Sequence, residues 1–261
     1  MDRPTRDRGL LGPEPVGVRH RGAPLLPETS TRFRNPLLRT RRRPTLASRP
    51  SDGLQRWGAA EVAEQIHGHQ AAEALLLDAV ATIGPIAKNS LWPWPQHRLS
   101  YANAAIPEVL IAAGHLLQRS RVLSDGLKLL RWLLDRETVD GHLSPTPVGG
   151  AGPDDAATGR FDQQPIEVAA MADACARAYA VTGDEEWRRG LELAISWFEG
   201  NNDLGAVMWD AQTHGGYDGL TASGPNLNQG AESTLALIST LQHAHRLDGS
   251  SATRPLVSVP D

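Results

Sequence analysis

Acidic residues recur at the start of three alanine-rich segments, and each of these segments follows a long polar stretch. Glu108, Glu167 and Glu232 are separated by 59 and 65 residues. A spacing of this size is typical of repeat architectures, and one repeat is long enough to hold two helices and a loop. The pattern therefore predicts stacked helical hairpins.

The apolar residues from about position 54 onward follow a helical period, and few runs of β-branched residues indicate strands. Helices are predicted over residues 54–83 with a break near position 68, 104–119, 122–137, 165–181, 185–199 and 229–246. Gly183 suits a helix C-terminus and Asp184 suits the N-cap of the next helix, which predicts a tight turn between them. We expect an all-α domain over residues 54–247.

The two members of each predicted hairpin differ in composition. The first members are rich in small residues, as in 169–180, whereas the second members contain more Leu, Trp and charge, as in 126–132 and 190–197. Small side chains let helix backbones approach closely, so we expect an inner layer of helices packed on all sides and an outer layer facing water. The long loops all lead from an outer helix to the next inner one, which predicts that they gather at one rim.

The two ends of the chain differ from this helical region. Residues 1–50 contain twelve Arg, no Lys and four acidic residues, which gives them a formal charge of about +8 against about −12 for the remainder. Frequent proline and the lack of an apolar period predict disorder over residues 1–53, and the tail 248–261 is predicted to be disordered as well. Nucleic-acid binding is not expected, because the arginines are not interleaved with aromatic residues that could stack on bases.

Several classes of site have no support in the sequence. No apolar run is long enough for a membrane span or resembles a secretory signal, so a cytoplasmic protein is expected. The single Cys175 excludes an internal disulfide, and no spacing of His with Cys or carboxylates suggests zinc. The Gly-Gly pairs at 149–150 and 215–216 lack the context of a phosphate-binding loop. We therefore predict neither a metal nor a cofactor.

Three carboxyl groups are candidates for catalysis. Glycoside hydrolysis needs one carboxyl group to protonate the leaving oxygen and another to activate water or attack the anomeric carbon. Glu167, working with Asp162 or Glu232, fits this requirement, because all three lie at or just before predicted inner-helix starts. The alternative is structural, since an acidic residue in a first turn is favoured by the helix dipole and satisfies free N–H groups.

The loops supply candidate sugar-binding side chains. Amides and carboxylates match the donors and acceptors of sugar hydroxyls, and the Trp-Pro-Trp stretch predicts an aromatic platform. The candidate substrate-binding residues are Trp92, Trp94, His142, Gln163, Gln164, Asn202, Asp203, Asp218, Asn226, Asn228 and Gln229. Local Asx-turns explain the Asp and Asn residues equally well. Trp132 and Trp197, at matching helix positions, are expected in the core.

Five loop segments have a distinctive sequence, namely 92–94, 140–145, 161–167, 200–203 and 226–234. Through these segments residues 88–246 resemble the six-hairpin, (α/α)-toroid carbohydrate-active proteins, and more narrowly the helical domain found beside glycosyltransferases in actinobacterial proteins. A full toroid implies six hairpins, whereas this chain provides about three. The resemblance therefore implies a partial (α/α) toroid.

Three functions are compatible with these features. The first is a glycoside hydrolase or a related sugar-processing enzyme, and the second is a non-catalytic glycan-binding or accessory module of a glycosyltransferase system. The third, a helical protein-interaction scaffold, is disfavoured because scaffolds do not need repeated long loops rich in Asp, Asn and Trp. The expected partners are a carbohydrate ligand and either a glycosyltransferase or a second copy of the chain, since an incomplete repeat array leaves an apolar face uncovered.

Overall fold

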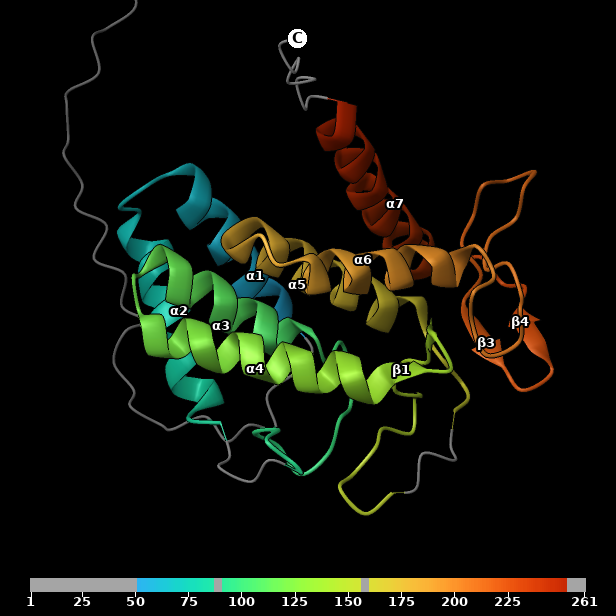
Figure 1. The fold of residues 1–261 in the computed structure, drawn as a ribbon, viewed down its shortest axis with the longest axis horizontal. Helices are drawn as coiled ribbons and strands as arrows, with labels where there is room; N and C mark the ends of the chain where they lie inside the picture. Colours follow the sequence, from blue (N-terminus) through green and yellow to red (C-terminus); the bar gives the residue numbers. More distant parts are fainter. Residues whose placement is uncertain (1–50, 87–90, 156–159, 253–261) are drawn as a thin grey trace, which may run out of the picture. The chain divides into compact units, whose positions relative to one another are not determined.

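Seven α-helices make up most of the part of the chain that the computed structural model describes, residues 51–86, 91–155 and 160–252 (Figure 1). These residues all belong to one structural unit, and the expected all-α class is confirmed. The helices are α1 (Ser51–Gln65), α2 (Gln70–Ile83), α3 (Ala105–Leu116), α4 (Ser120–Glu137), α5 (Pro165–Thr182), α6 (Glu185–Phe198) and α7 (Ala231–Ala252). Short strands form two hairpins, β1 (Thr138–Val139) with β2 (His142–Leu143) and β3 (Gly219–Thr221) with β4 (Gly224–Asn226).

The helical region is slightly longer than predicted at both ends. Helix α1 begins at Ser51 rather than at position 54, and α7 continues to Ala252, past the predicted end at 247. The remaining residues predicted to be disordered, 1–50 and 253–261, lie outside the described part of the chain.

Short turns join α1 to α2, α3 to α4 and α5 to α6 into helical hairpins (Figure 1). The break expected near position 68 is confirmed, since Gly68 has a φ of 77° and separates α1 from α2. The His69 side chain then caps α2 by accepting the Ala72 N–H at 3.2 Å. Gly183, with a φ of 72°, ends α5 in the left-handed conformation, and Asp184 is the N-cap residue of α6, as the sequence predicts.

The helices form two layers. Helices α1, α3, α5 and α7 contact one another in this order, and α2, α4 and α6 pack against them. Helix α3 is buried without interruption from Pro107 to Gly114, whereas α4 and α6 bury one face each. A Cβ atom on Gly114 would lie 2.3 Å from the backbone nitrogen of Leu123, so α3 and α4 approach very closely. Helices α3 and α5 are thus packed on most sides, as their small residues predict, whereas α7 leaves Leu235, Ile238 and Leu241 exposed.

Backbone hydrogen bonds connect the three long loops to each other. Leu99 pairs with Ala151 through bonds of 2.7 and 3.2 Å, and Gln163 pairs with Leu220 through bonds of 3.0 and 2.9 Å. The first pair joins the loop before α3 to the loop before α5, and the second joins the latter to the loop before α7. The long loops therefore lie side by side where the inner helices α3, α5 and α7 begin. We call this region the loop rim, residues 84–86, 91–104, 138–155, 160–164 and 199–230.

Candidate functional site

The Glu167 carboxylate is buried at the loop rim and holds the start of the neighbouring inner helix. Its Oε1 accepts the Ala102 N–H at 2.5 Å, and its Oε2 accepts both the backbone and the side-chain N–H of Asn103 at 3.0 Å. These residues lie just before α3, and Ala102 has a positive φ of 46°. Burial raises the pKa of Glu167 to about 7, although the three hydrogen bonds oppose this shift. Glu167 thus connects the start of α5 to the start of α3 by hydrogen bonds.

Glu232 is exposed and forms a pair with a tyrosine. Its Oε2 accepts the Tyr101 hydroxyl at 2.9 Å, and 43% of the Tyr101 surface is exposed. Burial of part of the ring and the hydrogen bond to Glu232 raise the pKa of Tyr101 to about 12, with a smaller contribution from the charge of Glu167. The starts of α3, α5 and α7 therefore bring Tyr101, Glu167 and Glu232 together.

A second carboxyl group, Glu137 at the end of α4, lies close enough to Glu167 for their charges to interact. It accepts hydrogen bonds from the Thr146 backbone at 3.0 Å and from the Thr146 hydroxyl at 2.5 Å. Burial and, secondarily, the charge of Glu167 raise the pKa of Glu137 to about 8. Glu137 could not be found from the sequence, because its position in the last turn of an outer helix carries no local signal of burial.

Three of the predicted sugar-binding residues meet in one network around Asp203. Gln163 donates to Asp203 Oδ2 at 2.6 Å and accepts the indole N–H of Trp197 at 3.2 Å. Arg160 lies 3.2 Å and His142 Nε2 lies 3.5 Å from Asp203 Oδ1. Burial opposes ionisation of Asp203, but the hydrogen bonds, led by that of Gln163, lower its pKa. This network ties the loop before α5 to the loop before α7.

Asp218 and Asn228 also come together, at the start of α7. Asp218 Oδ1 accepts the Gly230 N–H at 2.7 Å and the Ser233 hydroxyl at 2.8 Å, and its Oδ2 accepts a hydrogen bond from the Asn228 amide. The hydrogen bond from Asn228 is the largest cause of a lowered Asp218 pKa. Asp218 thus holds the residues at the start of α7 in place.

Asn202 and Asn226 organise their own loops. The Asn202 amide donates to the Ala206 carbonyl at 2.6 Å, and its oxygen accepts the N–H groups of Leu204 and Ala206. The Asn226 oxygen accepts the Asn228 N–H at 3.2 Å in an Asx-turn. Asn202 and Asn226 therefore make the local loop hydrogen bonds that were the structural alternative to ligand binding.

The remaining polar candidates lie nearer the surface. Asp162 is exposed, and only its backbone carbonyl has a described role, accepting the Val148 N–H at 2.9 Å. Gln164 is the N-cap residue of α5 without a side-chain capping bond. Gln229 is exposed and accepts the Thr213 hydroxyl at 2.6 Å. Asp162 and Gln229 are therefore placed where a ligand in solution could reach them, and Gln164 is half-buried beside Asp162.

The predicted aromatic platform of Trp92 and Trp94 is wrong. Trp94 is only 2% exposed and stacks on Trp132 with ring centroids 5.9 Å apart. Trp92 is half-buried, meets Trp132 edge-on at 5.2 Å, and donates its N–H to the Gln96 carbonyl at 2.9 Å. Arg136 covers the Trp92 ring at 5.2 Å. Both tryptophans pack against an outer helix, because the proline-containing loop folds back over α4.

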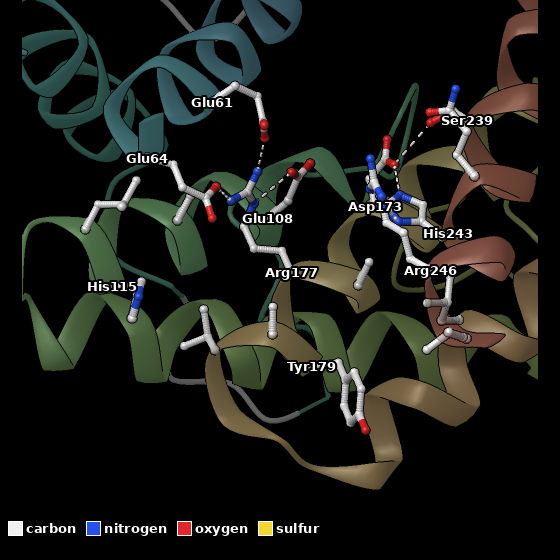
Figure 2. Close-up of a pocket in the computed structure, with 18 of the residues that line it drawn as sticks. Glu61, Glu64, Glu108, His115, Asp173, Arg177, Tyr179, Ser239, His243 and Arg246 are labelled. Atoms are coloured by element: carbon white, nitrogen blue, oxygen red, sulfur yellow. Dashed lines mark hydrogen bonds and ion pairs between the residues drawn. The ribbon is translucent and has the colours of Figure 1, made fainter. Parts of the chain in front are cut away.

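A pocket of about 620 Å³ lies between the four inner helices (Figure 2). It contains none of the residues that the sequence predicted as a site. Its charged and titratable lining residues come from α1 (Glu61, Glu64), α3 (Glu108, His115), α5 (Asp173, Arg177, Tyr179) and α7 (His243, Arg246). The pocket extends along the inner layer, away from the loop rim residues described above.

Arg177 is the centre of the ion pairs in this pocket. Its Nε lies 3.1 Å from Glu108 Oε1 and its Nη1 lies 3.0 Å from Glu64, while its Nη2 contacts Glu61 (Figure 2). Asp173 instead accepts from His243 at 2.7 Å. Asp173 and Arg177 are four residues apart on α5, a spacing that allows a local ion pair, but each residue finds its partners on other helices.

Glu108 has a buried carboxylate oxygen that faces no hydrogen-bond donor of the described residues. The residue is 5% exposed, and its Oε2 is buried without a hydrogen-bond partner among the described residues. Burial, the largest effect, raises its pKa to about 7 despite the positive charge of Arg177. A buried acceptor without a partner is costly, and such atoms often mark ligand sites.

The chain matches no protein-family model and no curated protein. Within residues 51–86, 91–155 and 160–252, no group of three or more His, Cys, Asp or Glu side chains is arranged to hold a metal ion. None of the helices in that same part of the chain is long and apolar enough to cross a membrane.

Proposed function

We propose that this chain is a carbohydrate-active domain of the partial (α/α)-toroid type, which binds a glycan at the loop rim. The observation that carries the proposal is the exposed pair of Tyr101 and Glu232 where three inner helices begin. A tyrosine ring can stack on a sugar ring, and the adjoining carboxylate can accept hydrogen bonds from the hydroxyl groups of the sugar. The resemblance of the loop segments to toroid carbohydrate-active proteins supports the same assignment.

In this proposal Tyr101 takes the role of the aromatic platform in place of Trp92 and Trp94. Its hydroxyl is held by Glu232 at 2.9 Å, which limits the orientations of the ring before a ligand arrives. Asp162 and Gln229 are exposed and Gln164 is half-buried, and in this proposal all three provide further polar contacts. The Asp203 and Asp218 networks hold the loops in position rather than contacting the glycan.

The hydrolytic form of the proposal requires two carboxyl groups that reach the ligand. Glu232 and Asp162 are exposed, whereas both oxygens of Glu167 are occupied by N–H donors. Catalysis would therefore use Glu232 with Asp162, and Glu167 would position the start of α3.

The second candidate is a non-catalytic glycan-binding module that assists a glycosyltransferase. It is favoured by the hydrogen bonds of Glu167, because this first candidate for catalysis uses both of its oxygens to hold the residues before α3. The two candidates share the binding site and differ only in turnover.

A glycan array followed by product analysis tests both candidates. We expect Tyr101→Ala and Glu232→Gln to weaken glycan binding at least about tenfold, which corresponds to roughly 1.4 kcal/mol. Asp78→Asn, a change of an exposed charge on α2 outside the loop rim, is the control. Product that disappears in Glu232→Gln and Asp162→Asn identifies a hydrolase, and binding without product identifies the recognition module. Absence of glycan binding by the wild-type chain refutes the proposal.

A further inference from the structure

We propose that the pocket between α1, α3, α5 and α7 is a second binding site, which takes a small organic cation carrying an ammonium group and uses Glu108 as its acceptor. The site is separate from the loop rim and does not depend on glycan binding there. Its volume of about 620 Å³ is sufficient for a ligand of several heavy atoms.

The charges that face the pocket favour a cation. Carboxylates come from α1, α3 and α5, at Glu61, Glu64, Glu108 and Asp173. The permanent positive charges are Arg177 on α5 and Arg246 on α7, and the titratable His115 and His243 lie on α3 and α7. Four carboxyl groups therefore face two guanidinium groups in this pocket. The excess of negative charge attracts a positively charged ligand.

The unpartnered oxygen of Glu108 gives the site a specific anchor. The three nitrogens of Arg177 are already directed at Glu108 Oε1, Glu64 and Glu61. None of these nitrogens forms a hydrogen bond with Glu108 Oε2, which has no partner among the described residues. An ammonium group supplies both the missing hydrogen-bond donor and the missing positive charge.

The nature of the lining distinguishes an organic cation from a metal ion. The described residues contain no group of three metal-ligating side chains, so a bare divalent ion would lack protein ligands. The lining also includes aliphatic carbons of Ala112, Leu116, Ala176 and Leu191, which suit the carbon chain of an organic ligand.

The titration of Glu108 provides an independent readout. Burial raises the pKa of Glu108 to about 7, so a substantial part of the carboxyl groups carries a proton at neutral pH. A bound ammonium group favours the ionised carboxylate and lowers its pKa. Binding at pH 7 should therefore release protons, whereas a neutral ligand that only occupies the space should not.

Isothermal titration calorimetry with 1,4-diaminobutane tests the site, with 1,4-butanediol as a neutral ligand of similar length. We expect saturable binding of the diamine, no binding of the diol, and a heat at pH 7 that depends on the ionisation enthalpy of the buffer. Glu108→Gln keeps the shape of the side chain and should weaken diamine binding at least tenfold. Glu199→Gln removes the same charge at a remote exposed position and should leave binding unchanged.

Folding of the variants is checked by circular dichroism. If Glu108→Gln does not fold, the double variant Glu61→Gln with Glu64→Gln replaces it, because both side chains are at least half exposed, and it should weaken diamine binding at least threefold. Equal binding of diol and diamine, unchanged affinity in the folded Glu108→Gln variant, or no saturation by about 10 mM diamine overturns the proposal. Glycan binding that is retained in Glu108→Gln shows that the two sites are separate.

Discussion

Replacing Glu167 by alanine should destabilise the fold far more than the same change at Glu232. The Glu167 carboxylate satisfies the backbone N–H groups of Ala102 and Asn103 and the side-chain amide of Asn103. Ala102 and Asn103 are 8% and 2% exposed, so solvent has little access to these donors. Each buried donor left without a partner costs about 1–3 kcal/mol.

The two backbone donors alone predict a loss of about 2–6 kcal/mol for Glu167→Ala, and water entering the vacated space favours the lower half of this range. Glu232→Ala removes one exposed hydrogen bond to Tyr101 and should cost roughly 0.5–1 kcal/mol. Glu167→Gln should fall between them at roughly 1–3 kcal/mol, because its amide nitrogen would face other donors.

Urea unfolding followed by circular dichroism measures these differences. With a slope of about 2 kcal/mol per M, a loss of 3 kcal/mol lowers the midpoint by about 1.5 M, which is well above the error of the method. The reasoning is refuted if Glu167→Ala and Glu232→Ala differ by less than about 0.5 kcal/mol. In that case the Glu167 carboxylate would not hold the start of α3, and its assignment as a catalytic group would regain support.

Two further predictions concern the buried acids and the helix contacts. The pKa values of Glu108, Glu137 and Glu167 are raised from 4.5 to about 7, 8 and 7, so the folded state binds more protons than the unfolded state between about pH 4.5 and 8. Stability should therefore fall as pH rises across this window, by at most about 1.4 kcal/mol per pH unit for each carboxyl group, and urea unfolding that shows equal or higher stability at pH 8 than at pH 5.5 contradicts this. Gly114→Ala should cost roughly 2 kcal/mol or more in thermal melts, because its Cβ would lie 2.3 Å from the Leu123 backbone nitrogen. Gly58→Ala in α1 should stabilise by about 0.5–1 kcal/mol, because its Cβ would meet no atom of the described residues within 4 Å. Similar melting of both variants would refute the close contact at Gly114.

The helical hairpins could be predicted because their signals are local. Pro165 at the first position of α5, Gly183 at its end and Asp184 before α6 each act through their own backbone geometry. The break at Gly68 follows from the same physics. These features depend on neighbouring residues in the chain, so they are visible without knowledge of the packing.

The roles of the periodic acidic residues could not be predicted in this way. Glu108, Glu167 and Glu232 all lie in the first turn of an inner helix, yet their partners are Arg177, the turn before α3 and Tyr101. Their shared position reflects a shared preference for helix starts. The different partners arise because each carboxylate meets a different neighbouring helix or loop.

The sequence by itself determined the all-α class, the hairpin boundaries and the division into small-residue and amphipathic helices, since propensity, caps and periodicity act over a few residues. Only the tertiary structure decided which polar groups are occupied and which remain available. Tertiary packing buries Trp94 against Trp132 and gives both oxygens of Glu167 hydrogen-bond donors. It leaves Glu108 Oε2, beside Arg177, without a hydrogen-bond partner among the described residues. Contacts across 60 to 120 residues depend on how the hairpins stack, and no local pattern in the chain encodes that stacking.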